Sequence, residues 1–179
     1  GVPGLMRLMR ENGMRGALVT NSRKSSSATK IAALKEFERH LEFRLTAPDP
    51  APEGSLGGPT FGSILKAKPD PEGYNRARNR AGVSRRDAVA FEDSKAGVEA
   101  AHAAGLKVVQ IQSDPAEYSD KATIRVESLG NKRDFDKVAK FLGLKYDPSR
   151  QMHRDDRIHK IDQTKAKPVR TTAPRPTGP

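Results

Sequence analysis

Short apolar runs alternate along the chain with longer segments in which apolar residues recur every three or four positions. The short runs predict buried strands at residues 17–19, 43–45, 88–91, 107–112 and 124–126. The helical spacing predicts helices near residues 5–9, 26–40, 71–81, 94–104 and 134–142. Strands that alternate with helices in this way indicate an α/β fold with an open, mostly parallel sheet.

Prolines and glycines set the limits of the expected core. Pro71 suits the first turn of a helix because that position needs no amide donor, and Gly82 ends the same segment. Residues 46–64 are rich in Pro and Gly and predict a long irregular loop. We therefore expect a core over residues 1–147 and a C-terminal extension over residues 148–179.

Composition excludes several classes of site within these 179 residues. There is no Cys, which rules out a disulfide scaffold and a thiolate zinc site in this stretch. No apolar run approaches the roughly 18 residues of a membrane span, so we expect no membrane partner. The 33 basic residues exceed the 22 acidic ones, and the net charge of +11 favours a polyanionic partner or an unpaired basic tail.

The C-terminal extension differs in kind from the core. Residues 163–179 hold no acid and four prolines, so this segment alone is expected to be disordered or extended. Two interpretations stay open, namely a solvated tail and a basic arm that orders on RNA or a ribonucleoprotein. The basic side chains of such an arm are Lys165, Lys167, Arg170 and Arg175.

Polar side chains follow the predicted strands, where ligands gather in an open parallel sheet. Thr20 and Asn21 come after the first strand and could bind a phosphate oxygen, although capping of the next helix explains them equally well. Lys68 precedes a Pro-Asp-Pro segment that would hold its ammonium group near the strand ends, where it could neutralise an anion.

Glu92 and Asp93 directly follow the apolar run at 88–91. Two adjacent carboxylates at the end of a buried strand are hard oxygen ligands of the kind that Mg²⁺ prefers. The alternative is that Asp93 caps the helix that begins near Ser94. Several arginines crowd residues 76–86, and this cluster is either a solvated helix face or a footprint for a phosphate backbone.

Taken together, these elements resemble motifs two, three and four of the haloacid dehalogenase superfamily, most closely its phosphatase and β-phosphoglucomutase-like branch. The likeness covers roughly residues 1–145 and is most specific from Lys68 to Ile111, where Lys-Pro, Glu-Asp-Ser and Ala-Gly elements recur at the family's separations. The resemblance implies a Rossmann-like core. It also implies that Thr20 and Asn21 bind the phosphoryl group and that Lys68 stabilises its charge. Glu92 and Asp93 would help to hold Mg²⁺.

The chain departs from the family pattern at the nucleophile. The resemblance implies an attacking aspartate in a D-x-D motif after an apolar first strand, and no such segment is present. Asp134-Phe135-Asp136 matches the D-x-D motif in residue type, but we interpret it as negative charge at a helix N-terminus. We therefore expect the sheet to lack its central first strand, which an upstream segment before Gly1 or a neighbouring chain would supply.

Two functions follow as hypotheses. The favoured one is a non-catalytic subunit of a large ribonucleoprotein particle such as a mitochondrial ribosome, because of the charge, the tail and the missing nucleophile. The alternative is a Mg²⁺-dependent phosphatase or phosphomutase for small phosphorylated metabolites, of which this chain is the motif-two-to-four portion. The first hypothesis implies a mitochondrial location, and otherwise we expect a cytoplasmic one.

Overall fold

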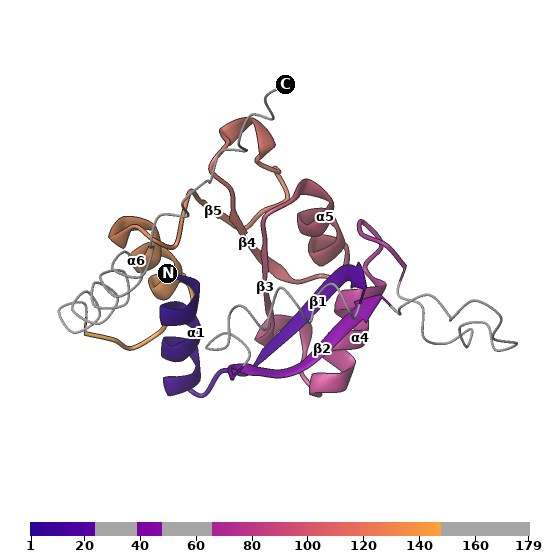
Figure 1. The fold of residues 1–179 in the computed structure, drawn as a ribbon, viewed down its shortest axis with the longest axis horizontal. Coiled ribbons are helices and arrows are strands. Elements are labelled where there is room, and N and C mark those ends of the chain that lie inside the picture. Colours follow the sequence, from indigo (N-terminus) through magenta and orange to yellow (C-terminus); the bar gives the residue numbers. More distant parts are fainter. Residues whose placement is uncertain (24–38, 48–65, 148–179) are drawn as a thin grey trace, which may run out of the picture. The chain divides into compact units, whose positions relative to one another are not determined.

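The computed structural model describes residues 1–23, 39–47 and 66–147 (Figure 1). The chain divides into two units, Gly1–Lys145 and Tyr146–Pro179. Only residues 146 and 147 of the second unit belong to the described part. The predicted basic extension, nearly all of the predicted helix at 26–40 and most of the predicted loop at 46–64 lie outside the described residues.

The first sheet is a parallel pair of strands. Helix α1 (Val2–Glu11) precedes strand β1 (Gly16–Arg23), and β1 pairs with β2 (Leu41–Ala47). Leu5 and Leu8 are buried on one side of α1 because their spacing of three residues places both on the same face.

The second sheet is also parallel, and its strands lie in the order β3-β4-β5. The strands are β3 (Val89–Glu92), β4 (Lys107–Ile111) and β5 (Ile124–Val126). Helix α5 (Lys95–Ala103) connects β3 to β4, and α6 (Lys132–Phe141) follows β5. The described residues also form two short 3₁₀ helices, at Arg85–Asp87 and Pro115–Glu117. The α/β class predicted from the sequence is confirmed.

Both sheets keep edges without a strand partner in the described part of the chain. β1 pairs only with β2, and β3 pairs only with β4, so the parallel strands form two sheets instead of one. An unpaired edge leaves backbone N–H and C=O groups open to another strand.

Helix α4 (Glu72–Ala81) packs against both β1 and α5. Gly73 lets the helix approach the strand closely, since a Cβ added there would lie 2.9 Å from Val19 Cγ1. Gly82 ends α4 in the left-handed conformation with φ of 66°, as the sequence predicted. The hydrophobic core beside α4 is formed by Tyr74, Ala90, Val98, Ala100, Ala101, Ala104, Leu106 and Val108.

The Asp134-Phe135-Asp136 segment lies in the first turns of α6. Asn131 caps the helix by accepting a hydrogen bond from the Asp134 amide at 2.8 Å. Asp134 Oδ2 in turn accepts from the backbone amides of Glu127 and Ser128, at 2.8 and 3.1 Å. The prediction that this segment supplies negative charge to a helix N-terminus is confirmed.

No helix in the described ranges is long and apolar enough to cross a lipid bilayer.

Candidate functional site

The centre of the site is a buried carboxylate at the end of β3. Glu92 is the last residue of this strand and is 8% exposed. Its Oε1 accepts hydrogen bonds from Lys68 Nζ and from the Tyr74 hydroxyl. The Lys68 ammonium also lies 5.3 Å from the centroid of the Tyr74 ring. The three side chains therefore form one contiguous cluster.

Local hydrogen bonds hold the segment that presents Lys68. The Lys68–Pro69 peptide bond is cis. Asp70 Oδ1 accepts from the Glu72 amide, and Glu72 Oε2 accepts from the Lys66 amide, both at 2.9 Å. The hydrogen bond from the Lys66 amide and the ion pair with Arg76 lower the pKa of Glu72. The turn between Lys66 and α4 is thus tied at both ends, which places Lys68 beside Glu92.

Burial determines the protonation of Tyr74. Burial, followed by the negative charge of Glu92, raises the pKa of the Tyr74 hydroxyl well above its ordinary value. The phenol therefore stays protonated and acts as a donor to Glu92 at neutral pH. The cluster consequently contains one cation, one anion and one neutral donor.

The first turn of α5 leaves room for the carboxylate. A Cβ added at Gly97 would overlap Glu92 Oε2, so a glycine is required at this contact as long as Glu92 keeps its position. The Ser94 hydroxyl caps α5 by accepting from the Gly97 amide at 3.2 Å. The alternative in which Asp93 caps this helix is therefore wrong, because Ser94 occupies the cap position.

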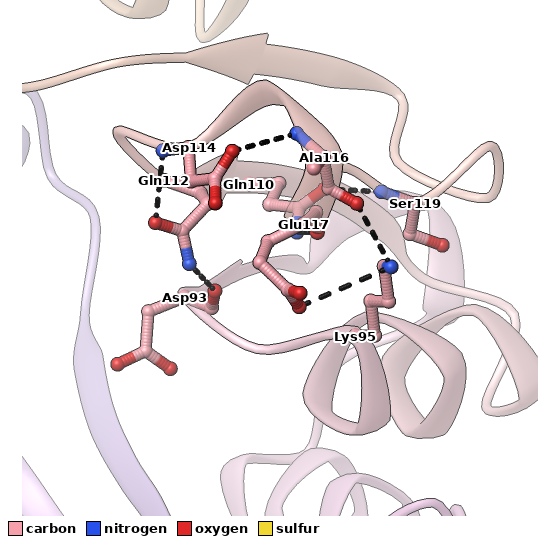
Figure 2. Close-up of polar contacts among 8 residues, drawn as sticks. All are labelled: Asp93, Lys95, Gln110, Gln112, Asp114, Ala116, Glu117 and Ser119. Carbon is pink, nitrogen blue, oxygen red and sulfur yellow. Dashed lines mark hydrogen bonds and ion pairs between the residues drawn. The ribbon is translucent and has the colours of Figure 1, made fainter.

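Asp93 differs from Glu92 in its surroundings. Its side chain is exposed, and its carboxylate makes no hydrogen bond or ion pair with the residues that the structure describes. In Figure 2 this carboxylate points away from the polar contacts of its neighbours. Only the backbone is held, since the Asp93 carbonyl accepts from Gln112 Nε2 at 3.1 Å.

These surroundings allow a test of the predicted magnesium ligands. Mg²⁺ usually takes one or two carboxylates and completes its shell with water and substrate phosphate. Asp93 fits this requirement because its oxygens are unpartnered, whereas Glu92 Oε1 already accepts from Lys68 and Tyr74. No group of three or more His, Asp or Glu side chains suited to a metal exists among the described residues. Of the two predicted ligands, Asp93 is therefore the one whose carboxylate is open to a cation.

Thr20 and Asn21 lie within β1, and not after it as the sequence predicted. The strand continues to Arg23 because Thr20 still pairs with Thr46 of β2. The Thr20 hydroxyl accepts from the Ser22 amide at 3.1 Å, and Asn21 is exposed. No hydrogen bond in the described part of the chain joins either residue to Lys68, Glu92 or Asp93. Thr20 follows Val19, whose Cγ1 lies close to Gly73 in the first turn of α4.

Two of the clustered arginines have partners within the fold. Arg76 forms an ion pair with Glu72 at 2.5 Å, and the Arg80 guanidinium lies 4.7 Å from the centroid of the Phe43 ring. These contacts favour the interpretation as a helix face over that of a nucleic-acid footprint.

Sequence reasoning missed two members of the site. Tyr74 occupies a position typical of an apolar helix face, so its hydroxyl gave no signal before Glu92 was placed next to it. Gln112 lies one residue beyond β4 and is 19 residues from Asp93. Its position after a strand end was the only available signal, since an amide there suits a polar contact at the site edge.

The family comparison agrees with these observations. The model of the family described as haloacid dehalogenase-like hydrolase matches residues 1–105. A CBBY-like protein of Arabidopsis thaliana is 30% identical over 114 residues, which are 62% of this chain and 32% of that protein. The chain thus spans about a third of that relative's length.

Solved structures show the same fold. β-Phosphoglucomutase from Clostridium difficile superposes with a TM-score of 0.58 at 19% identity, over 80% of this chain and 55% of that one. CbbY from Rhodobacter sphaeroides, crystallised with xylulose-(1,5)-bisphosphate, superposes with a TM-score of 0.56 at 22% identity, over 73% and 54%. The chain corresponds to about half of each of these proteins.

Proposed function

Because the chain belongs to the haloacid dehalogenase-like hydrolase family, we propose that it is the phosphate- and magnesium-binding portion of a phosphatase or phosphomutase. The substrates would be small phosphorylated metabolites. The observation that supports this most directly is the buried cluster of Lys68, Glu92 and Tyr74 next to the unpartnered carboxylate of Asp93. A sugar bisphosphate bound to a structural neighbour supports the same class of substrate.

Lys68 is the residue that would stabilise the charge of the phosphoryl group. An ammonium group has three donors, and the contact with Glu92 Oε1 uses one of them. Glu92 and Tyr74 hold the ammonium in one place, so its charge need not be reoriented during the reaction. Fixed charges of this kind stabilise a transition state better than mobile ones.

Asp93 would hold Mg²⁺ together with oxygens from the substrate. When bound, the cation supplies charge neutralisation for the phosphoryl oxygens. Thr20 and Asn21, in the second half of β1, would donate hydrogen bonds to the same oxygens. Glu92 acts in this proposal by holding Lys68, because its carboxylate already has two partners.

The attacking aspartate would come from outside this chain, on a strand that pairs with the open edges of β1 and β3. The family resemblance implies such a strand, and both edges lack a strand partner in the described ranges. An upstream segment of a longer polypeptide or a neighbouring chain would supply it. In either case, the aspartate at its end would lie between Thr20 on β1 and Asp93 after β3.

The test is phosphate release by the complete protein from a panel of sugar phosphates, with and without Mg²⁺. Lys68→Met is expected to lower kcat/KM by about 10²–10³-fold, as removal of one preorganised donor does elsewhere. Lys66→Ala is the matched control, because this lysine is 72% exposed and pairs only loosely with Asp70. Mg²⁺-independent turnover, or unchanged kinetics in Lys68→Met, would overturn the proposal.

A second candidate role is that of a non-catalytic subunit of a ribonucleoprotein particle such as a mitochondrial ribosome. Its support is in the sequence alone: the net charge of +11 and the acid-free segment 163–179. A former phosphatase that kept the Lys68, Glu92 and Asp93 side chains and acquired the basic segment would fit this role.

A further inference from the structure

The turn that contains Asp93 is fastened to the loop after β4 at two points (Figure 2). At one point, Gln112 Nε2 donates to the Asp93 carbonyl at 3.1 Å. At the other, Lys95 Nζ donates to the Ala116 carbonyl at 2.9 Å and lies 3.9 Å from a Glu117 carboxylate oxygen. The two contacts lie on either side of Ser94, so the whole turn is held from one direction.

Gln112 is itself held in place. Its backbone amide donates to the Val126 carbonyl at 3.0 Å, which continues the pairing of β4 with β5. Its side-chain oxygen accepts from the Asp114 amide at 3.2 Å. A side-chain amide fixed at its oxygen presents its nitrogen in a defined direction, and that direction is toward the Asp93 carbonyl.

The loop beyond Gln112 is anchored in the core. The Gln110 side chain is fully buried, and it donates to the Glu117 carbonyl at 2.9 Å and accepts from the Ser119 amide at 2.8 Å. Asp114 Oδ1 accepts from the Ala116 amide at 2.9 Å. These hydrogen bonds tie the exposed loop to the buried Gln110 side chain.

The Asp93 carboxylate gains its direction only from its backbone. It has no side-chain hydrogen bond or ion pair in the described part of the chain, and it is exposed. Rotation of the peptide plane at Asp93 would swing this carboxylate away from the strand ends. The hydrogen bond from Gln112 opposes that rotation.

We infer that Gln112 is a positioning residue for Asp93, which it holds in the orientation that binds a divalent cation. This inference rests on the proposed function, in which Asp93 is a magnesium ligand. Partners that orient metal ligands typically contribute 10–100-fold to metal affinity.

The test is a titration of the complete protein with Mn²⁺, in which binding is measured from the paramagnetic relaxation of water protons. Gln112→Met removes the donor at nearly constant length and is expected to weaken Mn²⁺ binding about tenfold or more. Ser113→Ala is the matched control in the same loop, because Ser113 is exposed and its side chain takes part in none of the contacts described above. Asp93→Asn is expected to reduce binding further than Gln112→Met does. Thermal unfolding of each variant separates loss of the ligand's orientation from loss of the fold.

The outcomes distinguish the inference from the proposed function. If Asp93→Asn weakens Mn²⁺ binding while Gln112→Met binds like the parent, the positioning role is wrong and the proposed function stands. If the parent protein binds no Mn²⁺, both fail. Should Gln112→Met unfold, Gln112→Asn keeps the amide but shortens its reach, and affinity equal to the parent's would then overturn the positioning role.

Discussion

Lys68 and Glu92 are 24 residues apart in the sequence and form an ion pair whose side chains are only 16% and 6% exposed. Taking both charges out of water is costly, and the structure compensates for this by adding the Tyr74 hydroxyl as a second donor to the same carboxylate oxygen. The pair therefore behaves as a unit, and removal of either member leaves the other buried without its counter-charge.

Glu92→Gln is expected to lower the free energy of unfolding by about 3 kcal/mol, because an ammonium group then stays buried without its partner. Urea denaturation followed by circular dichroism measures this. The matched control is Glu42→Gln, which breaks the Arg15–Glu42 pair with side chains 53% and 45% exposed. That surface pair should contribute no more than about 1 kcal/mol. Equal losses in the two variants would contradict the difference in burial.

Tyr74→Phe removes the hydroxyl and keeps the ring beside the Lys68 ammonium. We expect a loss of about 1.5–3 kcal/mol in unfolding free energy, the usual contribution of a hydrogen bond to a charged group. In the parent protein the raised pKa of Tyr74 should keep one phenol protonated in alkaline solution until the protein unfolds. An ultraviolet titration of the folded protein that shows a smaller phenolate signal in Tyr74→Phe than in the parent would mean that Tyr74 ionises and is not protected.

Asp134→Asn tests the capping network at the start of α6. Burial raises the pKa of Asp134, but hydrogen bonds from Asn131 and from the amides of Ser128 and Glu127 outweigh this effect, so the net shift is downward. A folded pKa below the unfolded value of about 3.9 means that the stabilisation is present above that pH and is lost as pH falls through the folded pKa.

The variant should therefore be less stable than the parent at pH 7, and the difference should shrink below about pH 4, where the parent carboxylate becomes protonated. Thermal unfolding at a series of pH values measures the difference. A difference in stability that grows as the pH is lowered would mean that folding raises the pKa of Asp134 instead of lowering it.

Deletion of residues 148–179 tests the basic arm. If the arm binds RNA, the deletion should weaken binding and reduce the dependence of log K on log salt, because fewer phosphates are neutralised. Filter binding to a structured RNA at several salt concentrations measures both quantities. The control replaces Lys165, Lys167, Arg170 and Arg175 by Gln within the full chain. RNA binding that is absent, or insensitive to salt and to both changes, would exclude this role.

Much of the secondary structure could be predicted because helical and strand periodicity is a property of neighbouring residues. The apolar run at 88–91 corresponds to β3, and Pro71 and Gly82 bracket α4. The end of β1 could not be predicted in the same way. This strand runs four residues beyond its apolar stretch, since a strand ends where its pairing ends and the partner β2 is distant in sequence.

The candidate site could be predicted in its residue types but not in its contacts. Glu92 and Asp93 are adjacent carboxylates, and nothing in their sequence context separates their roles. The structure separates them, because Glu92 is buried against Lys68 and Tyr74 while Asp93 is exposed. Which of two neighbouring side chains turns inward depends on the pleat of the strand and on what packs against it.

The sequence by itself determined the order of the described strands and helices, the residues that bound α4 and the polar residue types near the strand ends, since each depends on residues a few positions apart. Only the tertiary structure decided that Lys68 and Tyr74 contact Glu92 and that Gln112 donates to the Asp93 carbonyl. It also decided that the strands form two sheets, one with β1 and one with β3. These features depend on distances between segments far apart in the chain, which local periodicity does not specify.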